Sequence, residues 1–382
     1  MGNILTFNVG SSSLKIAMYV ENTCIFSANV DLLQGHVRYT GQTPDTLLAW
    51  KISGDLSHDA CQFIKQLPLT SQTIFAYRVV HGGEYLKPQS LSNVILDELE
   101  RLAPLCPLHQ PPALAVIKAL MQTYPQQQHI AAFDTTFHAQ QPDLSKRYAL
   151  PLEFYQQGIK SYGFHGLSCQ SIMRQLAILE PNLHQEKVLI AHLGNGASVT
   201  AVYQGQSQAS SMGFSTLDGL VMGTRCGHLD AGILLYLLSQ GWDETRLSQL
   251  LYKESGLLGL SGISSDIRTL LASDADQAKF AVDYFCQRVA REISSLATVI
   301  GGCDCLVLTG GIGENQPIIR QLILQQLSWL GVIIHDHANQ QSSSIISTKK
   351  SKIKVLLVHS DEQYELCLAA KNLCIPLPQR ES

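Results

Sequence analysis

Three glycine-rich segments of the sequence could present backbone N–H groups to a phosphate. They are residues 10–13, 194–196 and 310–315. Glycine lets the main chain approach an anion closely and adopt positive φ, while neighbouring Ser and Asn side chains add hydrogen-bond donors. The third segment follows an apolar run and precedes a helix expected from Pro317, an order that suits nucleotide binding. None has the phosphate-loop pattern with a fixed Lys, so the three turns together, and not one alone, predict a nucleotide site.

Two arginines lie near glycines. Charged residues are few in this chain, at 15% of the 382 residues. Arg78 shortly precedes the Gly82-Gly83 pair, and Arg225 lies between two further glycines. A guanidinium in such a place presents a planar fork that matches a carboxylate or a phosphate. A structural ion pair with a nearby Asp is the alternative for each. Two converging guanidinium groups would favour an anionic substrate.

Acids and a histidine that could act with these arginines lie near the ends of expected strands. Asp134 could act as a base, orient a substrate or hold magnesium, and a helix N-cap is its alternative role. Glu362 could hold magnesium directly or through water. His165 is the histidine we expect to stabilise charge, and the histidine spacings do not favour a zinc site. Lys15 either contacts a phosphate as a point charge or is a solvated strand lysine.

The segments that must position these side chains alternate between strands and helices. Apolar or β-branched runs such as 4–7, 188–192 and 305–309 predict strands. Apolar residues spaced three and four apart predict helices such as 166–179 and 274–300. Strands interleaved with helices predict an α/β architecture.

An internal repeat indicates two related domains. Residues 8–19 and 192–203 both pass from an apolar strand through a glycine turn into a second strand that ends in Tyr, although chance is the alternative. We expect one domain over residues 1–138 and a second over 139–362. A final helix within 363–382 would pack back on the first domain. Each turn would face an active-site cleft between the domains, where ligand sites are favoured.

Composition excludes several classes of protein. The net charge of −4 gives no field suited to nucleic acid, and no apolar run approaches the length of a membrane-spanning helix. No signal peptide is expected, and ten scattered cysteines predict free thiols in the reducing cytoplasm. The polar segment 339–354 is expected to be a solvated loop.

Several sequence runs resemble the acetate kinase family, within the superfamily of sugar kinases, heat-shock chaperones and actin. The runs occur in the family's order across essentially the whole chain. They are residues 8–15, 78–83, 133–138, 162–166, 192–198, 222–225, 261–268 and 309–315. The resemblance implies a duplicated ribonuclease H-like, actin-like ATPase fold, usually a homodimer. It also implies direct in-line phosphoryl transfer from ATP to acetate, giving acetyl phosphate and ADP, and the reverse reaction.

The resemblance also implies roles for individual residues. Asn8 and Glu362 would position Mg²⁺, with Mn²⁺ as an alternative. Arg78 would bind the carboxylate, with Val80, Leu108 and Phe164 around the acyl group. Asp134, His165 and Arg225 would be catalytic, Asp134 as an acid/base or orienting carboxylate and the other two by stabilising the transferring group. The residues expected to bind the nucleotide are Lys15, His192, Leu193, Gly194, Asn195, Gly196, Asp266, Ile267, Arg268, Gly310, Gly311, Ile312, Gly313, Glu314 and Asn315.

Departures from the family pattern leave the acyl substrate open between acetate and propionate. They occur at Tyr77, Gln110, Thr216 and His228. One methylene changes binding in an acyl pocket by only about 1 to 3 kcal/mol. An actin- or chaperone-like ATPase clamp is the alternative from another class, but such a clamp needs no carboxylate receptor. Acetate is already ionised, so positioning and charge neutralisation are the main tasks, which favours an orienting role for Asp134.

Overall fold

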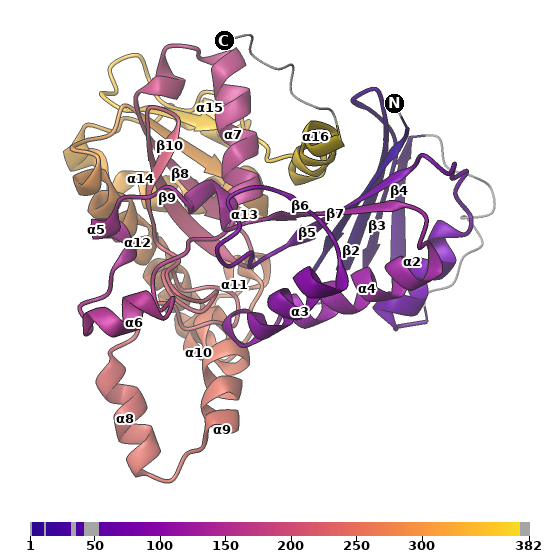
Figure 1. The fold of residues 1–382 in the computed structure, drawn as a ribbon. Coiled ribbons are helices and arrows are strands. Elements are labelled where there is room, and N and C mark those ends of the chain that lie inside the picture. Colours follow the sequence, from indigo (N-terminus) through magenta and orange to yellow (C-terminus); the bar gives the residue numbers. More distant parts are fainter. Residues whose placement is uncertain (1, 11–12, 32–35, 42–52, 375–382) are drawn as a thin grey trace. The chain divides into compact units, whose positions relative to one another are not determined.

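The structure is a computed structural model that describes residues 2–10, 13–31, 36–41 and 53–374. Ser11 and Ser12 of the first predicted turn lie outside the described residues. The chain divides into two compact units (Figure 1). Unit 1 comprises Met1–Ala139 and Asp361–Ser382, and unit 2 comprises Gln140–Ser360.

Unit 1 is built on a seven-stranded sheet in the order β4-β3-β2-β1-β5-β7-β6. Its strands are β1 (Ile4–Val9), β2 (Ser13–Val20), β3 (Thr23–Asp31), β4 (His36–Gly41), β5 (Ile74–Val79), β6 (Gln89–Ser90) and β7 (Gln128–Phe133). Strands β1 to β4 are antiparallel neighbours, β5 and β7 run parallel to β1, and β6 pairs antiparallel with β7.

The helices of unit 1 are α2 (Leu56–Ile64), α3 (Asn93–Arg101), α4 (Gln110–Thr123) and α16 (Glu362–Cys374), with short 3₁₀ turns η1 (Ala103–Leu105) and η2 (Thr136–His138). Helix α16 packs on β1, β2, β5 and β7, while α4 packs on β5 and α2. Every residue of β1 is buried, as expected for a central strand covered on both faces.

Unit 2 has a five-stranded sheet in the order β10-β9-β8-β11-β12. The strands are β8 (Lys187–Leu193), β9 (Ala197–Tyr203), β10 (Gln206–Ser210), β11 (Cys305–Thr309) and β12 (Lys354–Leu357). Its longer helices are α7 (Gly166–Leu179), α8 (Ala231–Ser239), α12 (Asp276–Val299) and α14 (Pro317–Gln325). The shorter ones are α5 (Asp143–Lys146), α6 (Leu152–Gln156), η3 (Leu183–Gln185), α9 (Glu244–Gln249), η4 (Leu250–Glu254), α10 (Gly256–Ser261), α11 (Ile267–Leu271), α13 (Gly310–Asn315), η5 (Ser328–Leu330) and α15 (Asp336–Gln340).

The two sheets share a strand order. In each, three antiparallel strands are followed by two parallel ones, β3-β2-β1-β5-β7 in unit 1 and β10-β9-β8-β11-β12 in unit 2. The repeat found in the sequence covers the matching hairpins β1–β2 and β8–β9. The predicted α/β class is confirmed. Because parallel strands end at one edge of a sheet, the segments after β5 and β7 lie together, as do those after β8 and β11.

One local expectation was wrong, and a second was correct only in part. Residues 310–315 form helix α13 and not an open turn, although only Gly310 has positive φ, at 78°. The polar segment 339–354 is partly structured, since Ile345 bridges to Leu356 and Asn339 is buried. Tertiary contacts override local propensity in both places. Among the described residues, no helix is long and apolar enough to cross a membrane.

Candidate active site

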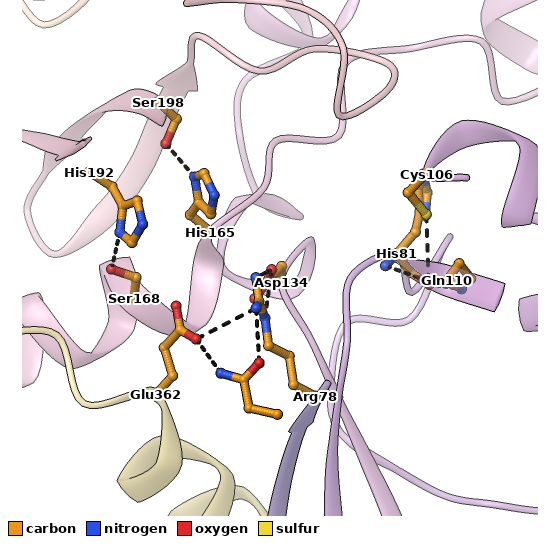
Figure 2. A network of polar contacts seen from close by, with 11 residues as sticks. Arg78, His81, Cys106, Gln110, Asp134, His165, Ser168, His192, Ser198 and Glu362 are labelled. Atoms are coloured by element: carbon orange, nitrogen blue, oxygen red, sulfur yellow. Dashed lines mark hydrogen bonds and ion pairs between the residues drawn. The ribbon is translucent and has the colours of Figure 1, made fainter. Parts of the chain in front are cut away.

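Arg78 is the centre of a polar cluster in unit 1. It lies near the end of β5, in register with Ala132 of the parallel neighbour β7, so Asp134 follows at the same sheet edge. The Nε and Nη2 groups of Arg78 donate to Asp134 Oδ2 at 3.1 and 2.6 Å (Figure 2). Its Nη1 donates to Asn8 Oδ1 at 3.0 Å, and Asn8 Nδ2 donates to Glu362 Oε2 at 2.6 Å. The cluster joins the ends of β1, β5 and β7 to the start of α16.

The Arg78 guanidinium of this cluster lies between two carboxylates. Burial by itself lowers the pKa of Arg78, but the nearby Asp134 and Glu362 carboxylates outweigh burial and raise it, so the guanidinium stays charged. Asp134 is fully buried, and Glu362 Oε2 lies 3.7 Å from Arg78 Nη1. Two carboxylates therefore lie beside one guanidinium, and they gather carboxylate oxygens at one place.

The donor atoms of this cluster suit a hard divalent cation. Mg²⁺ prefers oxygen ligands and is commonly held by one or two carboxylates together with substrate phosphates. Glu362 and Asp134 supply carboxylates, and Asn8 supplies an amide oxygen. Within the described ranges no group of three or more His, Cys, Asp or Glu side chains forms a ready metal cage. The cluster fits a magnesium ion that arrives with a phosphate better than a zinc site built by protein alone.

The loop after β5 is held in place by Gln110, at the start of α4. The fully buried Gln110 accepts from the His81 N–H at 3.2 Å and donates to the His81 carbonyl at 3.0 Å (Figure 2). The Gly82 N–H donates to Thr135 Oγ1 at 3.1 Å, which ties the loop to the residue after Asp134. Val80 of the same loop is buried.

A second cluster, in unit 2, surrounds the turn between β8 and β9. The rings of His165 and His192 stack with centroids 4.3 Å apart. Ser198 Oγ lies 2.9 Å from His165 Nδ1, and Ser168 Oγ lies 2.8 Å from His192 Nδ1 (Figure 2). Each hydroxyl fixes the orientation of one ring, because it can donate to or accept from the imidazole nitrogen.

Gly196 shows that Arg225 and His165 converge on this turn. A Cβ on Gly196 would lie 2.8 Å from Arg225 Nη2 and 3.3 Å from His165 Nε2. The loop that carries Arg225 is fixed to the turn by the Gly223 N–H, which donates to the Asn195 carbonyl at 3.2 Å. The turn, the cation and the imidazole thus form one site.

Arg225 is a buried cation of this site. It is 5% exposed, and its Nη1 donates to the Thr216 carbonyl at 2.5 Å. Over the ranges that the structure describes, no carboxylate lies within ion-pair distance of this side chain. Burial lowers the pKa of Arg225 to about 10. An anion at this place would offset the cost of the buried charge.

A cavity of about 520 Å³ lies beside the same turn. The residues that line it are Gly194, Asn195, Ser265, Asp266, Ile267, Arg268, Gly311, Ile312, Asn315 and Gln316. Asp266 is the N-cap of α11 and forms an ion pair with Arg268 at 2.5 Å, which lowers the pKa of Asp266. The size and mixed lining of the cavity suit a mononucleotide.

Not every residue that was expected to bind nucleotide lines this cavity. Leu193 is buried in the sheet, and Gly313 lies beneath the surface of α13. Glu314 folds back on its own helix, where it accepts from the Gly310 N–H at 2.9 Å and from Thr309 Oγ1 at 3.0 Å. Lys15 is exposed on β2 of unit 1. Of the expected acyl residues, Val80 and Leu108 belong to unit 1 and the buried Phe164 to unit 2.

Sequence reasoning did not assign roles to Ser168, Ser198, Ser265 or Gln316. Ser198 lies inside one of the family-like runs, and Ser265 inside another. Ser168 comes about one helical turn after His165. This spacing is only a weak indication that Ser168 would bind His192, which lies on the next strand.

Comparisons with known proteins agree with this geometry. The profile of the acetokinase family matches residues 3–368. The chain is 41% identical over 373 residues to an acetate kinase of Rickettsia felis, covering 94% of this chain and 96% of that protein. It is 37% identical over 383 residues to an acetate kinase of Methylocella silvestris, with coverage of 94% and 95%.

Solved structures give the same result. A propionate kinase from Francisella tularensis is 31% identical with a TM-score of 0.83, covering 97% of this chain and 100% of that one. An acetate kinase from Entamoeba histolytica is also 31% identical with a TM-score of 0.83, covering 97% and 99%. The resemblance seen in the sequence is confirmed, as is the fold class expected from it. The chain belongs to the acetokinase family.

Proposed function

We propose that this protein is an acetate kinase that transfers a phosphoryl group reversibly from ATP to acetate, giving acetyl phosphate and ADP. The observation that carries the proposal is the buried Arg225, which has no carboxylate partner among the described residues and meets His165 at a turn of the nucleotide-sized cavity. A cation held dry and unpaired beside such a cavity suits an enzyme that stabilises a transferring phosphoryl group.

Unit 2 would hold the nucleotide. Its cavity would take the nucleoside, and the turn 194–196 would offer backbone N–H groups to phosphate. Arg225 and His165 would neutralise the charge that develops on the equatorial phosphoryl oxygens. Ser198 would keep the His165 Nε2 edge toward the turn by binding Nδ1.

Unit 1 would hold the carboxylate. Acetate is ionised at neutral pH, since carboxyl groups have pKa values of about 4, so no base is needed to activate it. Asp134 occupies the Nε and Nη2 groups of Arg78 and fixes the plane of the guanidinium. We assign Asp134 an orienting role and Arg78 the binding of the acyl substrate, with Val80 and Leu108 near the acyl group.

Asn8 and Glu362 would hold the divalent ion, with Asp134 close by. Magnesium fits these oxygen donors best, and manganese shares the preference for carboxylate and carbonyl oxygen. When bound with the nucleotide, the ion would neutralise phosphate charge and orient ATP for transfer. Arg78, through its bond to Asn8 Oδ1, orients the amide at this site.

The test is the formation of acyl phosphate, trapped as the hydroxamate. Purified protein with ATP and magnesium would be supplied with formate, acetate, propionate or butyrate in separate reactions. We expect acetate to give the highest kcat/KM. A higher kcat/KM for propionate than for acetate would change the assigned substrate and leave the proposed mechanism unchanged. ATP hydrolysis without acyl phosphate from any carboxylate would overturn the proposal and favour an ATPase clamp.

The protein would act as a homodimer in the cytoplasm. Helix α8 has the sequence AGILLYLLS, yet it has no buried residue, and Figure 1 shows it extending with α9 away from the sheet of unit 2. An entire apolar helix in water is unusual, and a second copy packed isologously would cover it. Substitution L235E is expected to convert a dimer to a monomer in sedimentation velocity, and a monomeric parent protein would refute this part.

The proposed place in the cytoplasm is supported by the cysteines. All ten cysteines are free, as suits a reducing compartment.

A further inference from the structure

A fully buried arginine lies behind the nucleotide cavity. Arg320, on α14, has 0% of its surface exposed and is the largest fully buried side chain among the described residues. It does not line the cavity. Buried arginines are rare because the charge loses its hydration, so the contacts of this one require an explanation.

The guanidinium of Arg320 donates five hydrogen bonds, as many as it has N–H groups. Nη1 donates to the carbonyls of Gly313 at 3.0 Å and Glu314 at 2.9 Å. Nε donates to Asn339 Oδ1 at 2.7 Å, and Nη2 donates to the Asn339 carbonyl at 2.6 Å and to Ser342 Oγ at 3.0 Å. The side chain therefore ties the end of α13 to α15 and the residues after it.

All five acceptors are neutral. No carboxylate lies within ion-pair distance of Arg320 in the part of the chain that the structure describes, and burial lowers the pKa of its guanidinium. An apolar side chain would fill the same space without the cost of burying a charge. The contacts with main-chain carbonyls at the C-terminal end of α13 are also favoured by the helix dipole.

Helix α13 needs such support. It has six residues, three of them glycines, and helices this short do not persist alone. Its first N–H is held by Glu314, and its last carbonyls are held by Arg320. Gly311 and Ile312 lie between these fixed positions and Asn315 directly follows them, and all three line the cavity.

We propose that Arg320 is a positioning residue of the nucleotide site, which holds α13 in the place where its exposed face meets the nucleoside. The inference rests on the proposed function, because it assigns that cavity to ATP. Arg320 contacts neither substrate. Its loss lets the end of α13 move, so nucleotide binding weakens while carboxylate binding does not.

The test compares R320M and R320K with L324A. Leu324 is buried on the same helix and is not part of the nucleotide site, so L324A reports the effect of lost packing alone. Steady-state hydroxamate kinetics would give kcat and both KM values, and thermal unfolding with and without ADP would give the shift due to nucleotide.

We expect R320M to raise the KM for ATP about tenfold or more and to shrink the ADP-induced shift in Tm, with the KM for acetate changed less than twofold. R320K keeps the charge but reaches fewer acceptors, so its KM for ATP should lie between those of R320M and the parent protein. L324A should lower Tm and leave both KM values unchanged.

An unchanged KM for ATP in R320K and R320M would overturn the inference and leave Arg320 a purely structural residue. If R320M does not fold, R320K against L324A decides alone: a KM for ATP raised only in R320K supports the inference, and equal values overturn it. If the parent protein forms no acyl phosphate and shows no ADP-induced shift, the proposed function fails instead.

Discussion

Replacing Arg225 by methionine should separate activity from stability. The substitution removes the guanidinium and keeps an unbranched apolar side chain. Burial lowers the pKa of Arg225 well below its ordinary value, to about 10. Each pKa unit corresponds to 1.36 kcal/mol, so the charge costs the folded protein about 3 kcal/mol when no anion is bound.

The sign follows from linkage. The unfolded chain holds this proton more tightly than the folded one, so the cost is fully present below pH about 10 and disappears as the pH rises toward the ordinary pKa of arginine. At pH 7 the ligand-free R225M protein should therefore be at least as stable as its parent, by up to about 3 kcal/mol. The loss of the hydrogen bond from Arg225 to the Thr216 carbonyl would lower the free energy of unfolding by about 1 kcal/mol.

Activity should change in the opposite direction. A cationic donor that meets the transferring phosphoryl group contributes about 10³-fold or more to kcat. Hydroxamate kinetics would measure kcat, and urea unfolding without ligand would measure the free energy of unfolding. R225K, which keeps a charge but loses the fork, is the matched control and should retain more activity than R225M. If R225M retained its kcat, or lost more than about 2 kcal/mol of stability, Arg225 would be a structural cation and the reasoning would be refuted.

Four further results are expected. G311A should raise the KM for ATP, because Gly311 lines the cavity, and should change Tm little, because nothing lies within 4 Å of the added Cβ. G310A should instead lower Tm, because Gly310 has a φ of +78° and its Cβ would lie 2.7 Å from the Leu193 carbonyl oxygen. Q110L should raise the KM for acetate and cost about 2 to 4 kcal/mol in urea unfolding, since His81 loses two buried main-chain bonds; an unchanged KM for acetate would separate the loop from the acyl site. EDTA should abolish turnover without unfolding the protein in circular dichroism, and added magnesium should restore it; turnover that survives chelation would contradict the assigned metal site.

The sequence predicted those parts of the site that are marked by unusual local composition. Glycines mark the turn 194–196. Gly223, two residues before Arg225, approaches Asn195 closely, since a Cβ there would lie 2.1 Å from Asn195 Oδ1. Central strands such as β1 and β11 were predictable because buried parallel strands read as continuous apolar runs.

Other parts depend on contacts that no local pattern reveals. Segment 310–315 has poor helix propensity, and it becomes a helix because Glu314 and Arg320 hold its ends. Asn339 lies in a polar stretch that suggests a solvated loop, and it is buried because Arg320 binds it. The pairing of Arg78 with Asp134 follows from the order of β5 and β7 in the sheet, which the sequence alone does not determine.

The packing of α16 on the sheet of unit 1 has a consequence for biosynthesis. Helix α16 covers β1 and β5, and Glu362 at its start bonds to Asn8 across 354 residues of chain. The ribosome makes β1 about 350 residues before α16, so that strand is synthesised long before its covering helix emerges. Unit 2, which is continuous from Gln140 to Ser360, can fold during that interval. Until α16 is made, the nascent chain carries an uncovered apolar sheet, and it is then that aggregation competes with maturation.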